Sequence, residues 1–407
     1  MPRVIGLKRL RSLKERITPH GRRHLPLGSG PYTVGCVDVM TDHSVAGLFL
    51  RLYYPTNSTD AQWPLWLPNK KYGNGYVYFR RKNTKIFGTI LNWVGGDMYV
   101  PVLWQAPVLE TEEVAEPFPV VLFTHGLGGN RTTYSTLCSD IASNGFIVAA
   151  IEHRDGSASM TYCFKQPACN DTFLEEEIGC LEAESKEDDF NIRNKQVQLR
   201  VTEIQRLLDF LETVNAGREV RNVLGHHFDL RSLKGRLDMS KVSVVGHSFG
   251  ASTAIATLAS GDQRVKCGVA LDGWMLPLDQ SVYSEVTAPL LMVNTESFQW
   301  KDNVRPMYRF GVNGDDEKMR RLLITIRGTC HQSQSDFQFM VPGRIGRMLE
   351  VRHTLEPRVA MDLNNKATLG FLAKHLDIPN CDHHDDILLG ENPLVIQGTN
   401  LDLNSDD

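Results

Sequence analysis

The sequence contains no long hydrophobic run, and this absence excludes two classes of protein. No stretch of about 18 consecutive apolar residues occurs, so nothing in it predicts a transmembrane helix. The first residues contain no apolar core of the kind that marks a secretory signal peptide. Position 2 holds Pro2 instead of glycine, which excludes N-myristoylation. From these absences we expect a cytoplasmic or membrane-associated protein.

The sequence also lacks a strong charge of either sign and lacks motifs for metals and nucleotides. The net charge is −4 over 407 residues, and no zinc-finger or RNA-binding motif occurs, so we expect no nucleic-acid partner. No H-E-x-x-H motif and no phosphate loop is present. We therefore predict a reaction that uses no metal and no other cofactor.

None of the eight cysteines forms a C-x-x-C pair. Cys163, Cys169 and Cys180 fall in one loop-like region and could form a disulfide in an oxidising compartment. Free thiols are the default expectation without a visible signal peptide. The stretch 381–386 (Cys-Asp-His-His-Asp-Asp) has a metal-like composition, but its polar surroundings favour a solvated tail.

What is present is an alternation of short apolar runs and helical patterns from about residue 119 onward. Runs that are short, apolar and rich in β-branched residues are typical of parallel strands covered on both faces. The alternation predicts one doubly wound, mostly parallel α/β sheet with antiparallel N-terminal edge strands. The strands are expected at 48–54 (the antiparallel edge), 120–124, 146–151, 242–245, 268–271, 290–293 and 322–326, with helices at 193–214 and 366–376.

The segments on either side of this pattern differ from it in composition. Residues 1–30 form a basic arm, in which Leu10, Leu13 and Ile17 recur at helical spacing among lysines and arginines. An amphipathic helix on an anionic membrane surface and a solvated arm are both open interpretations. The acidic stretch 175–189 is expected to be a surface loop or helix. We predict a single domain over 31–390 and a polar tail over 391–407.

The most informative segment places a serine between a strand and a helix. The run 242–245 leads into Gly-His-Ser-Phe-Gly at 246–250, and small residues at helical spacing follow. In this setting G-x-S-x-G is typical of a nucleophile elbow, whose turn is too sharp for side chains at Gly246 and Gly250. The following helix directs its positive end at the site. We predict Ser248 as a nucleophile; the alternative is an ordinary tight turn.

A serine hydroxyl needs a base to take its proton and a carboxylate to orient that base. In the α/β-hydrolase arrangement these follow in the order Ser, Asp or Glu, His, each at the carboxyl end of a strand. Asp272 directly follows the next predicted strand and is the candidate acid, with a capping role as the alternative. His331 follows the last strong strand and is the candidate base, with an exposed loop histidine as the alternative. Asp279 and Asp302 are weaker candidates because neither directly follows an apolar strand.

The other histidines fit the role of base less well. They are His125 and His153, which precede the serine, His247 inside the elbow, His375 in a predicted helix, and His383 and His384 in the polar tail. Cys330 beside His331 is a rival nucleophile, but adjacent residues project in different directions.

The oxyanion of such a reaction needs backbone N–H donors. Phe249, the residue after the serine, supplies the first donor. The second is expected in the His-Gly-Leu-Gly-Gly loop at 125–129, where Leu127 is our candidate. An ordinary glycine turn is the alternative for this loop.

Together these residues resemble the platelet-activating factor acetylhydrolases, serine phospholipases that cut short or oxidised acyl groups from the sn-2 position. The resemblance runs from about residue 30 into the C-terminal region and implies the same five residues: Ser248, Asp272 and His331 as the triad, Leu127 and Phe249 as oxyanion donors. One departure is Ala251, where the family usually has a second glycine. The matching segments are 30–36, 49–55, 125–128, 152–155, 157–159, 246–250, 271–277, 331–333 and 336–337.

The resemblance implies a monomeric, calcium-independent α/β-hydrolase with a phospholipid substrate, releasing lyso-phospholipid and a short carboxylic acid. A general lipase or carboxylesterase of the same fold and a non-catalytic lipid-binding protein are the alternatives. The resemblance also implies docking on a membrane or lipoprotein surface, and similarity to the plasma form would make the protein extracellular. The implied docking residues are Ile86, Phe87, Ile90, Leu91 and Trp93, then Ile345, Met348 and Leu349.

Overall fold

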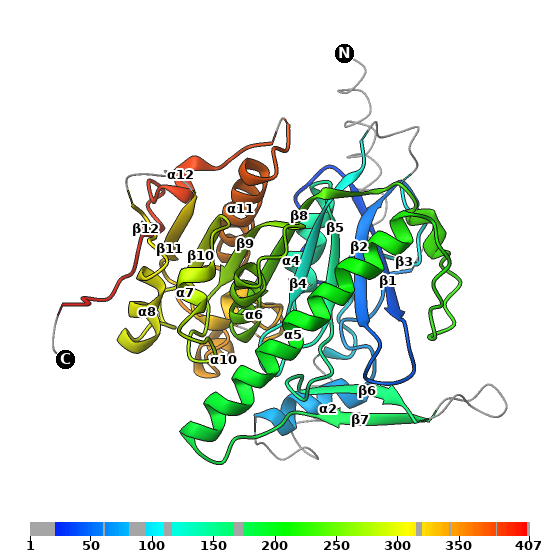
Figure 1. Cartoon of the computed structure of the whole chain (residues 1–407), viewed down its shortest axis with the longest axis horizontal. Coiled ribbons are helices and arrows are strands. Elements are labelled where there is room, and N and C mark those ends of the chain that lie inside the picture. Colours follow the sequence, from blue (N-terminus) through cyan, green and yellow to red (C-terminus); the bar gives the residue numbers. More distant parts are fainter. Residues whose placement is uncertain are drawn as a thin grey trace. The chain divides into compact units, whose positions relative to one another are not determined.

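The computed structural model of the chain describes residues 21–59, 62–80, 95–109, 116–165, 174–314, 320–341, 343–379 and 381–404. These residues form two units whose segments alternate along the chain. Figure 1 traces the chain and labels its helices and strands. Unit 1 comprises the described residues of 1–123, 127–181 and 203–240, and unit 2 comprises those of 124–126, 182–202 and 241–407.

Unit 2 is built on a parallel sheet with the strand order β12-β11-β10-β9-β8. β8 (Leu237–His247, in unit 2 from residue 241), β9 (Val265–Leu271), β10 (Leu290–Thr295) and β11 (Arg321–Ile326) pair in parallel. β12 (Val395–Gln397) pairs with β11 in the antiparallel direction. All six residues of β10 are buried, as expected of a central strand in a parallel sheet.

The register of these strands aligns their carboxyl ends. The last residue of β8, His247, is paired with Leu271 at the end of β9. Leu271 is paired in turn with Val293 on β10. The residues that follow β8 and β9, Ser248 and Asp272, therefore leave the sheet at the same edge.

The helices of unit 2 connect these strands or follow them. The longest, α11, packs against β9 and β10, and its N-terminus is capped by Glu356, whose carboxylate accepts the N–H groups of Arg358 and Val359. Pro357 occupies the first position of α11, where its missing N–H costs nothing. The helices are α6 (Phe249–Ala259), α7 (Val282–Glu285), α8 (Lys301–Tyr308), η3 (His331–Gln334), α9 (Phe337–Met340), α10 (Gly343–Met348), α11 (Pro357–His375) and α12 (Asp385–Leu388).

Unit 1 has the strand order β4-β5-β2-β1-β3. β2 (Phe49–Thr56) runs antiparallel to both of its neighbours, β1 (Thr33–Met40) and β5 (Ile147–Ile151), and every residue of β1 and β2 is buried. The remaining elements are α2 (Lys70–Phe79), β3 (Leu103–Trp104), β4 (Phe118–Thr124), α4 (Ser135–Ser143), the hairpin of β6 (Met160–Phe164) with β7 (Glu175–Gly179), and η1 (Leu230–Leu233). Helix α5 (Lys186–Asn215) contributes residues to both units.

Every strand and helix predicted above within the described residues is present, with three corrections. The segment 48–54 was expected at an edge, yet β2 lies between β1 and β5. The acidic stretch begins with an exposed strand, β7, whose backbone pairs with β6 and whose carboxylates form surface ion pairs with Lys71 and Lys165. The polar tail contributes β12, whose backbone continues the sheet beyond β11.

Other predictions fall partly outside the described residues. The basic arm is described only from residue 21. The possible disulfide remains untested because Cys169 lies outside the described ranges. Cys163 is a free, buried thiol. Within the described parts of the chain, no helix is both long and apolar enough to cross a bilayer. That residues 31–390 form one domain stays a prediction.

Unit 1 contains a network of buried charges. Arg51 donates to both oxygens of Asp38 at 2.6 and 3.0 Å, and Arg131 donates to Asp38 at 2.7 Å. Arg131 also donates to Glu152 at 2.5 Å, and the Tyr72 hydroxyl donates to the same carboxylate at 2.7 Å. Burial acts to raise the pKa of Asp38, but Arg131 and then Arg51 hold that pKa well below its ordinary value.

Replacing the shared guanidinium, Arg131→Met, should lower the free energy of unfolding by about 3–5 kcal/mol, because two buried carboxylates lose a partner. Since the folded pKa of Asp38 is lowered, its contribution to stability is present above the unfolded pKa of about 3.9 and is lost as the pH falls below it. Urea unfolding at pH 7 and at about pH 3, below the unfolded pKa of the carboxyl group, measures both effects. Arg231→Met removes an exposed ion pair with Asp229 and should leave the midpoint unchanged; equal effects of the two changes would contradict this account.

Candidate active site

Ser248 occupies a strained turn between β8 and α6. Its backbone has φ 57° and ψ −118°, a combination that side-chain-bearing residues rarely adopt. A Cβ atom on Gly246 would overlap the carbonyl group of Gly250, and one on Gly250 would overlap the carbonyl oxygen of Thr124. The two glycines are therefore required by the close backbone approach, as the motif predicts, and the turn places the serine at the N-terminus of α6.

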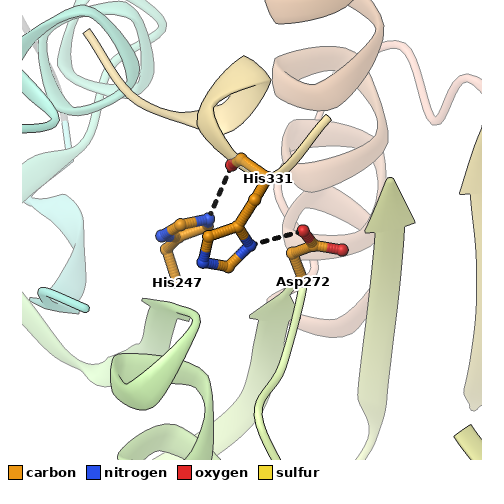
Figure 2. Close-up of side chains that lie close together, drawn as sticks. All are labelled: His247, Asp272 and His331. Carbon is orange, nitrogen blue, oxygen red and sulfur yellow. Dashed lines mark hydrogen bonds and ion pairs between the residues drawn. The ribbon is translucent and has the colours of Figure 1, made fainter. Parts of the chain in front are cut away.

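The structure brings the three predicted residues Ser248, Asp272 and His331 together. His331 Nε2 lies 2.9 Å from Ser248 Oγ, and His331 Nδ1 lies 2.6 Å from Asp272 Oδ2 (Figure 2 shows the second bond). The carboxyl side chain is only 1% exposed, whereas the imidazole is 21% exposed. This chain of hydrogen bonds can move the serine proton to Nε2 while the carboxylate stabilises the positive ring.

Asp272 is itself held by the end of β10. The backbone N–H of Thr295 donates to Oδ1 and its hydroxyl donates to Oδ2, each at 2.7 Å. The N–H of Asp272 donates to Val293 at 2.8 Å, and its φ of 47° turns the chain out of β9. The carboxylate is thus fixed with one oxygen directed at His331. Sequence reasoning missed Thr295, although its position at the end of the strand after the acid was a usable signal.

Two further rings contact His331. Phe298 stacks on it with a centroid distance of 3.7 Å and an interplanar angle of 25°. His247 lies 4.4 Å away at 35°, and its Nε2–H donates to the carbonyl oxygen of His331 at 3.1 Å (Figure 2). Burial, and then the charge of His331, hold the pKa of His247 well below its ordinary value, so this ring is neutral. Sequence reasoning set His247 aside as a base and did not identify Phe298.

His247, Asp272 and His331 also form a possible metal-ligand set, since their ligand atoms lie within 4.8 Å of one another. Both nitrogens of His331 are already hydrogen-bonded, one to Ser248 and one to Asp272. His247 directs Nε2 at a carbonyl oxygen. This set is therefore arranged for proton transfer, and the described ranges contain no second group of this kind, including at His383 and His384.

The rival nucleophile Cys330 is poorly placed to react. Its sulfur contacts Ser333 Oγ at 3.6 Å and the carbonyl oxygen of Glu350 at 3.5 Å. Burial raises the pKa of this thiol, which disfavours the reactive thiolate.

The two predicted oxyanion donors lie in different units. Phe249 is the first residue of α6, so its N–H is one of those that a helix leaves without an intrahelical acceptor. Its ring is fully buried under the Arg200 guanidinium, 4.3 Å away, and Arg200 also donates to the carbonyl oxygen of His125 at 2.8 Å. Leu127 is half-buried in unit 1, in the loop after β4. The pairing of the two donors stays a prediction.

The predicted docking residues are described in part. On and next to α10, Ile345 is 49% exposed, Met348 76% and Leu349 48%. The others lie outside the described residues: Ile86, Phe87, Ile90, Leu91 and Trp93.

Comparison with known protein families and curated proteins gives one consistent result. Residues 17–393 match the model of the family described as platelet-activating factor acetylhydrolase, isoform II. The platelet-activating factor acetylhydrolase of Canis lupus familiaris is 39% identical over 94% of this chain and 84% of its own length. That of Gallus gallus is 39% identical over 93% and 90%. A putative phospholipase A2 of Schizosaccharomyces pombe is 27% identical over 87% and 92%.

Among solved structures, the ferulic acid esterase of Streptomyces cinnamoneus superposes with a TM-score of 0.62 over 93% of this chain and 99% of its own. At 18% sequence identity this likeness concerns the fold alone. Together with the parallel strands and intervening helices, it confirms the predicted α/β-hydrolase fold.

The close approach at Gly250 gives a test of the elbow. Gly250→Ala should destabilise the protein by about 1–3 kcal/mol, because the added methyl group meets the backbone of Thr124 and His125, which cannot move aside cheaply. The matched change Gly343→Ala, at the first residue of α10, meets no atom closer than 3.8 Å and should change stability by less than about 0.5 kcal/mol. Thermal denaturation of both variants measures the difference; a neutral Gly250→Ala would contradict the close-approach argument.

Proposed function

The chain belongs to the platelet-activating factor acetylhydrolase, isoform II, family, as its motifs predicted, and on this premise we propose how it acts. It is an ester hydrolase that removes the acetyl or a short oxidised acyl group from the sn-2 position of glycerophospholipids. The products are a lyso-phospholipid and a short carboxylic acid. The observation that carries the proposal is the continuous hydrogen-bonded chain from Ser248 through His331 to Asp272.

In the proposed reaction Ser248 Oγ attacks the ester carbonyl carbon while His331 Nε2 takes the hydroxyl proton. Asp272 stabilises the imidazolium through Nδ1–H, and the oxyanion binds the N–H of Phe249 and, we propose, that of Leu127. Collapse of the tetrahedral intermediate breaks the bond to the sn-2 oxygen, which leaves with the proton from His331. Water, activated by the same base, then attacks the acyl-serine and releases the acid.

Each step of this mechanism is assigned to a side chain or backbone group of the chain itself. The base is an imidazole, the charge that stabilises it is a buried carboxylate, and the oxyanion donors are backbone N–H groups. These assignments support hydrolysis that is independent of calcium.

The size of the acyl group is the part of the proposal that depends most on the relatives. Proteins named platelet-activating factor acetylhydrolase are similar to this chain over almost its whole length, which favours an acetyl ester. The more distant relative named putative phospholipase A2 supports a glycerophospholipid substrate without indicating chain length.

We further propose that α10 touches the lipid surface from which the substrate is taken. Of the residues of α10, Gly346 is buried. Ile345, Met348 and the adjacent Leu349 expose their apolar side chains next to Arg344 and Arg347. Exposed apolar side chains with neighbouring cations are typical of helices that lie in an anionic membrane interface.

The central test of the proposed function is Ser248→Ala on a panel of esters. The change should lower kcat/KM for an sn-2 acetyl phospholipid by about four to six orders of magnitude, because no side chain remains to form the acyl-enzyme. The control is Ser260→Ala, at the far end of α6, which should keep the parent rate.

Acetate release and labelling by an organophosphonate measure the outcome. Turnover by Ser248→Ala at the parent rate would refute the mechanism. Preference of the parent for long-chain or neutral esters would favour a general lipase or carboxylesterase. Absence of labelling at Ser248 in the folded parent would favour a non-catalytic lipid-binding protein.

The docking surface has its own test. Met348→Ser should weaken partition into vesicles of mixed phosphatidylcholine and phosphatidylglycerol about tenfold, because a largely exposed apolar side chain no longer enters the interface. Val359→Ser alters an apolar residue of α11 that is 40% exposed and serves as the control. Co-sedimentation measures both, and equal binding by the two variants would argue against α10.

A further inference from the structure

His331 lies between two aromatic rings. The centroid of Phe298 is 3.7 Å from the imidazole centroid and that of His247 is 4.4 Å from it, at interplanar angles of 25° and 35°. Two rings lying side by side over one face would need centroids roughly 6 Å apart to avoid overlap of their edge atoms. Rings that stack at the roughly 3.5 Å of carbon contact and have these centroid distances are offset sideways by only about 1 and 3 Å. Phe298 and His247 therefore cover opposite faces of the imidazole.

His247 also fixes the backbone that carries the base. Its Nε2–H donates to the carbonyl oxygen of His331 at 3.1 Å (Figure 2). His247 is the last residue of β8 and directly precedes Ser248. The hydrogen bond therefore joins the strand end that carries the nucleophile to the first residue of η3, which carries the base.

Phe298 covers the other face from the segment after β10. Its ring is partly buried, and Trp300 packs on it edge-to-face at 5.0 Å and 89°. An aromatic face attracts a cation, so this contact strengthens when His331 accepts the serine proton. The ring thus both limits rotation of the imidazole and favours its charged form.

From this geometry we infer that His247 and Phe298 are positioning residues for the base, holding the imidazole plane so that Nε2 faces Ser248 and Nδ1 faces Asp272. The inference rests on the proposed function, because it assigns a role toward the proposed base. A residue that only packs would alter stability, and one that only contacts substrate would alter KM. A positioning residue alters kcat, since a displacement of about 1 Å of a catalytic group costs on the order of 100-fold in rate.

The test separates the two contacts that His247 makes with His331, through its ring and through its N–H, from the ring contact that Phe298 makes with His331. His247→Gln keeps an N–H donor without the ring, His247→Phe keeps a ring without the donor, and His247→Ala removes both. Phe298→Leu removes the aromatic ring at similar volume, and Phe298→Tyr keeps it. Tyr308→Leu, which removes a partly exposed ring at the end of α8, is the control.

Turnover of an sn-2 acetyl ester is measured per active site, counted by organophosphonate titration so that unfolded protein does not contribute. We expect kcat to fall about 10- to 100-fold in His247→Ala and Phe298→Leu with KM within about twofold of the parent. His247→Gln, His247→Phe and Phe298→Tyr should each recover part of the loss, and Tyr308→Leu should match the parent. An unchanged kcat in both His247→Ala and Phe298→Leu, or an increase in KM alone, would overturn the inference.

A second measurement does not depend on turnover. The proton shared by His331 Nδ1 and Asp272 should give a downfield proton resonance. We expect this resonance to persist in Ser248→Ala and to broaden or disappear in His247→Ala and Phe298→Leu. A resonance unchanged in these two variants would refute positioning. Turnover retained by Ser248→Ala would instead refute the proposed function while leaving this geometric result intact, so the two failures are distinguishable.

Discussion

The paired ends of two parallel strands are the constraint on which the rest of the site depends. Because His247 on β8 pairs with Leu271 on β9, Ser248 and Asp272 leave the sheet at one edge. Both residues then take positive φ values, 57° and 47°, which turn their side chains away from the strand direction. One imidazole can bridge them only while that register holds. The two glycines of the elbow and the hydrogen bonds of Thr295 both serve this alignment.

The charges buried in the two units are compensated in different ways, and the difference bears on chemistry. In unit 1, Asp38 is neutralised by two guanidinium groups, an arrangement that stabilises the fold above the pKa of the unfolded carboxyl group. In unit 2, Asp272 bonds to the neutral donors of Thr295 and to His331. A guanidinium at that position would satisfy the carboxylate permanently. Neutral donors orient it and leave its charge to act on the imidazolium when that ion forms.

Local patterns in the sequence predicted the strands, the elbow and the three residues of the hydrogen-bonded chain, because each of the three follows an apolar strand. The rest depends on contacts between segments distant in sequence. Thr295 and Phe298 matter only because β10 lies beside β9. The end of a strand marks the position of Thr295, but no pattern around Phe298 indicates its role. The Asp38–Arg131–Glu152 network escaped notice for the same reason. β7 was missed because it is short and polar and is held by backbone pairing with β6. β12 was missed because its apolar residues are only Val395 and Ile396, too few to indicate a strand.

The proposed docking helix and the proposed base belong to one hydrogen-bonded stretch of unit 2. Gln338 donates to the carbonyl oxygen of Ser333 in η3, and Arg352 donates to the carbonyl oxygen of Gln338, each at 2.6 Å. Arg352 also packs over Gly346, the buried residue of α10. A helix held to its neighbours in this way cannot tilt freely when its apolar side chains enter lipid. The depth at which α10 sits would therefore set how far His331 lies from the interface.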